Sequence, residues 1–508
     1  MVRKDVKYGA IFSYILIIMN SLYGVLITPY TISYLGVAEY GVYKTISSFT
    51  AAFVVLDFGI GSTMIRYIAK FRVDHQEEKI PNYIAMCLMQ AIVLIAISAI
   101  VLFLGYQNLE SIYEVGLTPK ELSKAKQLYI VLAASMCLHI LSNVFSGIIK
   151  GYNKFSFSNG FSLFFLVFRV ILILVLIPIV KDSLVLVVIN LVSSLLCIVV
   201  EFIYAHFKLK VRIKFTHWDG TLFKESFIYT ILMFITTVEA QVNNSLDNVV
   251  IGAFLSSTAV AIYSVGLLVF NMFEHLSSAI SSVMLPTVIE TMKTDDKLRH
   301  NTQSLIVSVG RIQFILLGAA LVGFVVVGKE FLELWMGESF GRAYGITIIL
   351  MIPSLFELCV NVCLAMLRAE NKIGFRTFVV SFTMVLNLIV TIVGTRIWGY
   401  YAAAFGTAIA FFLGSDIIMN VYYYKHYHIN MIKIYGRIFK KIWVCLIFSG
   451  IACYFAKILV STPLLKVMLG ITAFVIVYGI TLLLYGLDEK EKELLKLNKF
   501  IKGVKKNG

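Results

Sequence analysis

Three basic residues, Lys44, Arg169 and Arg311, stand inside long apolar segments of the sequence. On insertion scales such a residue costs roughly 2.5–3.5 kcal/mol at the centre of a membrane, so it usually faces a partner or a cavity. The planar fork of donors on arginine suits phosphate oxygens. We therefore predict that these cations line a cavity and bind an anionic group. The structural alternative is that the arginines pair with internal carboxylates and that Lys44 snorkels to the membrane surface.

A polar stripe runs along the segment TTVEAQVNNSLDNVV. Glu239, Asn243 and Asp247 recur every fourth residue, with Asn244 beside them, so a helix would carry them on one continuous face. Such a stripe cannot face lipid. Its amides and acceptors would suit sugar hydroxyls, and its carboxylates could hold a proton or a sodium ion. The alternative is a hydrogen-bonded interface between helices.

Further ionisable residues stand in the apolar segments. Asp57, in VVLDFGIGS, precedes two glycines, which predicts a local break, with Asp57 capping the next segment or pairing with a basic residue; ion coupling is the second interpretation. Glu274 and His275 are neighbours and form a candidate titratable relay. Four others each stand alone on their segments and are predicted to be packing residues: His139, Glu201, Glu357 and Asp416.

Composition identifies the elements that must position these residues. The 508-residue chain is 59% hydrophobic and only 14% charged, with a mean hydropathy of +0.87, which is typical of an all-α polytopic membrane protein. We predict about fourteen transmembrane helices, each near the following residues: 8–30, 40–62, 82–105, 127–148, 158–180, 184–206, 225–250, 258–284, 303–327, 346–366, 374–395, 400–423, 438–458 and 465–486.

Lys and Arg concentrate in alternate connections between these segments, which places both termini in the cytoplasm. The net charge of +15 then reflects this bias and attraction to anionic membrane lipids, not nucleic-acid binding. The seven cysteines lie within apolar segments and are expected to be free thiols, without a metal site. The first apolar segment is read as a retained helix, not a signal peptide. No phosphate-binding GxxxxGK[ST] motif is present, so no ATP site is expected.

A short pattern occurs twice, as IIKGYNKFSFSN at 148–159 and as MLRAENKIGFRT at 366–377. YLGVAEYGVY (34–43) and FLSSTAVAIY (254–263) match at nearly the same offset. Two like-oriented copies of six helices follow, with a binding site between them. In this repeat Asn387 is the counterpart of Arg169, and it joins the predicted binding residues. The predicted parts are an N-lobe (1–206), a cytoplasmic linker (207–224), a C-lobe (225–427), two appended helices (436–486) and a basic amphipathic tail (487–508).

LDFGIGSTMIRYIAK (56–70), LDNVVIGAFLSSTAVAIYSVG (246–266) and the two NK turns resemble the bacterial polysaccharide and O-antigen flippases. This family shares a superfamily with the multidrug and toxin extrusion transporters and the lipid II flippase. The resemblance implies transfer of undecaprenyl-pyrophosphate-linked oligosaccharide from the inner to the outer leaflet of the bacterial cytoplasmic membrane. The glycan would serve O-antigen, capsule or exopolysaccharide synthesis, with polymerase machinery as a candidate partner. No cofactor is expected; coupling to sodium, protons or the membrane potential stays open.

Two other classes of membrane protein share some of these features. An ion-coupled drug exporter of the same architecture is kept open by Glu239 and Asp247, although cationic drugs would not favour a cavity lined by arginine. A membrane glycosyltransferase or polymerase would carry catalytic residues in a large outer loop. The longest outer loops, 105–127 and 328–346, hold no paired carboxylates. The chain is therefore not expected to be an enzyme.

Overall fold

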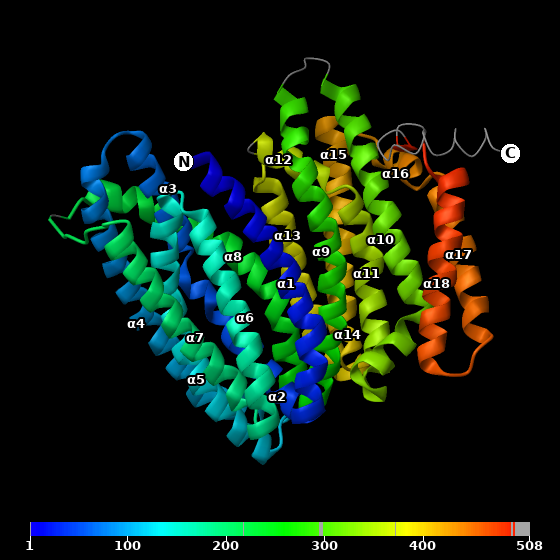
Figure 1. Cartoon of the computed structure of the whole chain (residues 1–508), viewed down its shortest axis with the longest axis horizontal. Coiled ribbons are helices and arrows are strands. Elements are labelled where there is room, and N and C mark those ends of the chain that lie inside the picture. The colour runs from blue at the N-terminus through cyan, green and yellow to red at the C-terminus, as the bar shows by residue number, and fades with distance from the viewer. Residues whose placement is uncertain (1, 217, 294–297, 371, 489–490, 493–508) are drawn as a thin grey trace. The chain divides into compact units, whose positions relative to one another are not determined.

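The computed structural model describes residues 2–216, 218–293, 298–370, 372–488 and 491–492. Throughout these ranges the ordered elements are helices, and no strand occurs (Figure 1). Among the described residues, twelve helices are long and apolar enough to cross a membrane, or thirteen if the bent pair Met431–Phe439 and Ile442–Ile458 counts as one span. The remaining expected span, 225–250, falls on a helix in which several side chains lie outside the described set. The prediction of an all-α membrane protein is confirmed, and fourteen remains an approximate count.

The chain divides into two compact units. The first comprises Met1–Ser264 and Leu388–Ala403, and the second comprises Val265–Asn387 and Ala404–Gly508. This division is not the one expected from the repeat, because residues 225–250 fall in the first unit. The predicted lobe boundaries stay a prediction.

Eleven elements make up most of the first unit: α1 (Val2–Leu35), α2 (Val37–Ala52), η1 (Phe53–Asp57), α3 (Ile60–Val73), η2 (Glu77–Lys79), α4 (Ile80–Tyr113), α5 (Pro119–Gly151), α6 (Phe155–Val180), α7 (Leu184–Ile203), η3 (Tyr204–Lys208) and α8 (Gly220–Phe254). The start of α9 (Ser257–Lys293), the end of α13 (Gly374–Trp398) and the start of α14 (Tyr401–Phe411) complete it.

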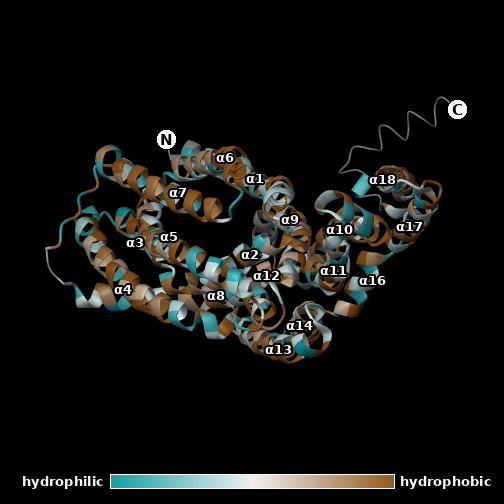
Figure 2. Cartoon of the chain, turned by 90° about the horizontal axis from the view of Figure 1, so that it is seen from below, coloured by the Kyte–Doolittle hydropathy of each residue, from teal (hydrophilic) through white to brown (hydrophobic). Residues whose placement is uncertain are grey.

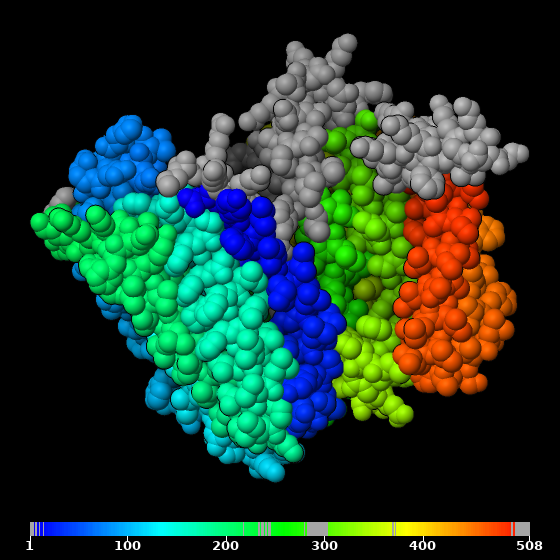
Figure 3. Space-filling model, in the orientation of Figure 1, coloured from blue at the N-terminus to red at the C-terminus, as the bar shows by residue number. Residues whose placement is uncertain are grey.

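The second unit contains the rest of these three helices and a further set: α10 (Leu298–Met336), η4 (Glu338–Arg342), α11 (Ala343–Cys359), α12 (Val362–Ala369), η5 (Phe412–Ile418), α15 (Met419–Tyr427), α16 (Met431–Phe439), α17 (Ile442–Ile458), α18 (Pro463–Thr481) and η6 (Leu482–Gly486). The last two long helices, α17 and α18, lie side by side and pack on α10 (orange and red in Figure 3).

Apolar residues make up much of the helices in each unit, as the brown colour in Figure 2 shows, and many of them are exposed. In a soluble protein such exposure would invite aggregation, whereas in a bilayer these side chains face lipid. Examples are Ile92, Val93 and Ile100 on α4, and Phe448, Ile451 and Phe455 on α17.

The duplicated sequence pattern makes the same main-chain hydrogen bond at both places. The amide of Lys154 donates to the carbonyl of Ile149 at 3.1 Å, and the amide of Lys372 donates to the carbonyl of Leu367 at 2.9 Å. Each hydrogen bond closes a helix end, and a new helix, α6 or α13, begins directly afterwards. The prediction that the pattern connects two helices is therefore confirmed.

The start of α1 is tied to the turn before α6 by one carboxylate. Asp5 accepts hydrogen bonds from Ser156 Oγ at 2.7 Å and from Lys154 Nζ at 3.0 Å. These two bonds lower the pKa of Asp5, since both favour its charged form. The stabilisation is present above the ordinary aspartate pKa and is lost as the pH falls through the lowered, folded-state value.

We expect Asp5→Asn to lower the thermal unfolding temperature of the purified protein at pH 7. The difference from the unmutated protein should shrink as the pH falls from 3.8 through the lowered folded-state pKa of Asp5, because the protonated carboxyl group is then as uncharged as the amide of the variant. Thermal unfolding curves of both proteins at pH 7 and at a pH below 3.8 measure this difference. A gap of equal size at low pH would show that the substitution acts by some other means.

Candidate functional site

In the first unit, Arg169 of α6 points toward α7 and α1. Its Nη1 donates to Asn190 Oδ1 at 2.9 Å, and its guanidinium carbon lies 5.9 Å from the centre of the Tyr23 ring. Within the described ranges Arg169 forms no ion pair with a carboxylate. The charge is therefore held by an amide oxygen and an aromatic face, which orient the guanidinium without neutralising it.

Lys44 of α2 is connected to the same place through tyrosines. Its Nζ lies 5.7 Å from the centre of the Tyr40 ring, which lies 6.1 Å from the ring of Tyr43. The hydroxyl of Tyr23 is close enough to Tyr40, Tyr43 and Arg169 to interact with all three electrostatically. We call this set the Arg169 cluster: Tyr23, Tyr40, Tyr43, Lys44, Arg169 and Asn190.

The Arg169 cluster has the chemistry of an anion and sugar site. Its two cations are half-buried and make no ion pair in the described part of the chain, and each lies on a tyrosine ring, Lys44 on Tyr40 and Arg169 on Tyr23. Binding sites for small molecules combine such aromatic walls with a few fixed polar groups. Two of the three predicted cations thus lie in one unit, beside tyrosines of one set.

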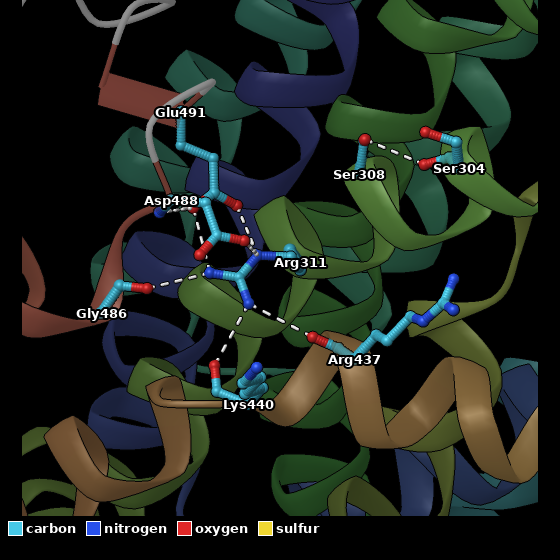
Figure 4. Close-up of polar contacts among 8 residues, drawn as sticks. All are labelled: Ser304, Ser308, Arg311, Arg437, Lys440, Gly486, Asp488 and Glu491. Carbon is cyan, nitrogen blue, oxygen red and sulfur yellow. Dashed lines mark hydrogen bonds and ion pairs between the residues drawn. The ribbon is translucent and has the colours of Figure 1, made fainter.

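Arg311 has a different environment, shown in Figure 4. Its guanidinium forms ion pairs with two carboxylates and donates hydrogen bonds to three backbone carbonyls, and only 4% of its side chain is exposed. Two of those carbonyls belong to Lys440, just before α17, and to Gly486, the last residue of η6. Arg311 therefore lies level with the ends of two other helices and pairs with carboxylates. Substrate binding by Arg311 stays a prediction.

Asn387 and Asp247 are both buried and both hydrogen-bonded. Asn387 donates to Thr407 Oγ1 at 3.1 Å within the second unit. Asp247, in the first unit, accepts from Tyr263 Oη at 2.5 Å and from Thr391 Oγ1 at 3.4 Å. Substrate binding by Asn387 and ion coupling by Asp247 stay predictions.

Asp57 caps a break in the chain, as its sequence context indicated. Phe58 and Gly59 adopt left-handed backbone angles between η1 and α3, with φ values of 53° and 70°. Asp57 Oδ1 accepts from the amide of Gly59 at 2.6 Å, and Oδ2 accepts from Asn143 Nδ2 at 2.7 Å. The capping interpretation is confirmed, and ion coupling by Asp57 stays a prediction.

A group of carboxylates in the second unit was missed. Glu357 lies close enough to Glu274 and Asp416 to interact with both electrostatically, and it faces Arg376 at 3.6 Å. In the described structure both carboxylate oxygens of Asp416 are buried without a hydrogen-bond partner. Glu274 was predicted to act with His275, whereas Glu357 and Asp416 each stood alone on their segments and were predicted to be packing residues. Nothing in the sequence indicated that the three meet.

His275, the other member of the predicted relay, is exposed and lies next to Glu274 on α9. The side chains of Glu239, Asn243 and Asn244 lie outside the described set. Of the residues that the structure describes, no three His, Cys, Asp or Glu side chains form a group that could hold a metal ion.

Comparison with known proteins gives one family. Residues 6–292, more than half of the chain, match the family described as polysaccharide biosynthesis protein. Two relatives come from Haloferax volcanii. The probable low-salt glycan biosynthesis flippase Agl15 is 24% identical over 243 residues, 47% of this chain and 50% of that protein. The probable flippase AglR is 28% identical over 178 residues, 34% of this chain and 37% of that protein. The chain thus matches half or less of the length of these relatives.

Two solved structures share the fold. A lipid II flippase, MurJ, in an inward closed conformation aligns with a TM-score of 0.65 at 15% identity, covering 93% of this chain and 98% of that one. A multidrug resistance MATE family transporter in an inward-facing conformation aligns with a TM-score of 0.60 at 14% identity, covering 80% and 94%. At these identities the likeness concerns the fold.

Proposed function

This chain belongs to the family of polysaccharide biosynthesis proteins, and from that premise we propose that it is a flippase for a lipid-linked oligosaccharide. The proposed cargo is a glycan on a polyprenyl phosphate or pyrophosphate carrier, and no covalent bond is made or broken. The names of two relatives, both probable flippases, and the fold shared with a lipid II flippase support this proposal.

The observation that carries the proposal is the Arg169 cluster. Its guanidinium is oriented by Asn190 and Tyr23 and makes no ion pair with a carboxylate in the described ranges, so it remains available to an incoming phosphate oxygen. Lys44 adds a second cation on the same tyrosine set. A drug exporter for organic cations would need the opposite charge at this place.

Finer features of the proposal rest on the sequence. The resemblance favours undecaprenyl pyrophosphate as the carrier and the bacterial cytoplasmic membrane as the location, whereas the two relatives named above are archaeal. The distribution of Lys and Arg assigns both termini to the cytoplasm. Transport would then run from the inner to the outer leaflet by alternating access, for delivery to polymerase machinery.

Reconstitution tests the function directly. Purified protein is placed in vesicles that contain a labelled oligosaccharide on undecaprenyl pyrophosphate, and a membrane-impermeant glycosidase digests the glycan that reaches the outer leaflet. We expect the digestible fraction to rise from about half to nearly all within minutes. A parallel sample with the monophosphate carrier compares the two headgroups. A digestible fraction that stays at half with both carriers would exclude the proposal.

The carboxylate group of the second unit supports a second candidate, an ion-coupled exporter. Glu357 interacts electrostatically with Glu274 and Asp416 and lies 3.6 Å from Arg376, and these carboxylates could instead couple transport to protons. Drug susceptibility of a host that produces the protein distinguishes the two. An exporter would raise resistance to cationic drugs, and a flippase would leave it unchanged.

A further inference from the structure

Asn190 of α7 holds the guanidinium of Arg169 in one orientation. Arginine carries only donors, so the amide oxygen of Asn190 must be the atom that faces Nη1 at 2.9 Å, and its NH2 group cannot bond the arginine. Within the described ranges, neither this NH2 group nor the remaining N–H groups of Arg169 have an acceptor in the protein. Unused donors from two helices, α6 and α7, therefore lie at one place.

The two residues lie well inside their helices. α6 continues for eleven residues beyond Arg169, to Val180, and Asn190 is the seventh residue of α7. An arginine at such a depth usually pairs with a carboxylate, because an uncompensated charge is unfavourable in hydrocarbon. Arg169 instead has an amide oxygen and the ring of Tyr23 as neighbours. The amide therefore orients the charge without neutralising it.

Carboxylates that belong to α7 or border it bind other groups. Glu201 lies eleven residues after Asn190, or ~16 Å along the helix, and accepts a hydrogen bond from Ser142 Oγ at 3.1 Å. Glu39 Oε1 accepts a hydrogen bond from the amide of Ser183, directly before α7, at 2.7 Å. The helix that holds the arginine thus carries an acid, but that acid lies about three turns away.

We propose that Asn190 makes the Arg169 cluster selective for the phosphate group of a lipid. Its oxygen positions the guanidinium and leaves the positive charge uncompensated, and its NH2 group donates to a second oxygen of the same headgroup. A phosphate or pyrophosphate ester offers negative charge and only acceptors at its outer oxygens, which matches a site made of donors. The inference rests on the proposed function, because that function supplies a cargo with such a headgroup.

Asn190→Asp is the most informative substitution, since aspartate has nearly the size of asparagine and carries a negative charge. It would form an ion pair with Arg169 and repel an incoming phosphate. We expect the preference for undecaprenyl phosphate over undecaprenol to fall about tenfold, the factor that corresponds to the loss of one charge-assisted hydrogen bond. The thermal unfolding temperature should equal or exceed that of the unmutated protein, because the new ion pair compensates the charge of Arg169.

Native mass spectrometry of the full-length protein in detergent measures the binding. Undecaprenyl phosphate, undecaprenyl pyrophosphate and undecaprenol are titrated separately, so both headgroups are compared with the same chain without phosphate. A purely structural role of Asn190 would weaken the binding of all three lipids alike and leave their ratio unchanged. The matched control is Asn108→Asp, at an exposed position of α4, which adds the same charge and should keep the preference for phosphate.

Asn190→Ala tests whether Asn190 acts through Arg169. It should lower the preference for phosphate about threefold alone and by a smaller factor in the Arg169→Ala background, since residues that act together are not additive. If Asn190→Asp does not fold, the alanine variant decides in its place.

The inference is overturned if the unmutated protein binds undecaprenol as tightly as both phosphates, or if the folded variants at position 190 keep the unmutated ratio. It is equally overturned if Asn108→Asp lowers the ratio as much as Asn190→Asp, since net charge would then explain the effect. Binding is measured without transport. A protein that selects phosphate through Asn190 but flips no glycan would therefore refute the proposed function and leave this inference standing.

Discussion

Arg169→Ala is expected to lower delivery of the lipid-linked glycan about 10- to 100-fold. The guanidinium supplies charge-assisted hydrogen bonds, each worth about 1.5–3 kcal/mol, and about 1.4 kcal/mol corresponds to a factor of ten. Alanine would remove the cation and leave Asn190 and Tyr23 without it. Surface glycan in a host that lacks its own copy of the protein measures the effect, normalised to the amount of protein in the membrane.

Two companion variants give this experiment its specificity. Arg169→Lys keeps the charge and loses the planar fork, so an intermediate effect is expected. Arg396→Ala removes another helix-borne arginine of the first unit, which lies 4.9 Å from the centre of the Phe254 ring, and should leave transport unchanged. Wild-type glycan levels with Arg169→Ala at normal abundance would remove the Arg169 cluster from the proposed site.

Gly147→Leu is expected to destabilise the first unit severely. A Cβ atom at Gly147 would lie 2.8 Å from the carbonyl oxygen of Gly61 and 2.8 Å from Met64 Cβ, so α3 and α5 would have to separate. Overpacking of this kind costs typically about 1–3 kcal/mol and sometimes more. Leucine favours a helix more than glycine does, so any loss must come from packing. Thermal unfolding of the purified protein and its yield in the membrane measure the result.

The matched control is the same substitution at Gly323 of α10, where a Cβ atom would meet no atom within 4 Å. There we expect no loss, or a gain of up to about 1 kcal/mol from helix propensity. If both leucine variants unfolded at the same temperature, the close approach of α3 and α5 would not limit stability.

Local features were predictable because the residues that cause them are neighbours in sequence. Asp57 stands before Phe58 and Gly59, and the break that it caps could be predicted from those few residues. The turn ending at Lys154 was likewise visible, since its hydrogen bond spans five residues. The helical spans followed from apolar runs, which lipid imposes directly on the sequence.

Pairings between helices were not predictable. Periodicity indicates which face of a helix is polar, but not which helix that face meets, so nothing in the sequence connected Glu274 with Glu357 and Asp416. Asp416 also lies on η5, a π-helical segment whose wider turn rotates the following side chains away from α-helical spacing. The apolar segment around Arg311 likewise gave no sign of its partner Glu491, which lies 180 residues further along the chain.

The turn between α5 and α6 also determines which of its positions tolerate substitution. Main-chain atoms close it, through the amide of Lys154 and the carbonyl of Ile149, so the turn itself needs few particular side chains. Asn153 is one exception, since its φ of 60° excludes branched side chains. Lys154 and Ser156 are others, because their side chains bind Asp5. A saturation library across this connection would therefore retain chiefly Asn, Asp and Gly at position 153, restrict positions 154 and 156, and accept a wide alphabet elsewhere. Such tolerance explains how a motif can persist twice in one chain while only three of its twelve letters agree.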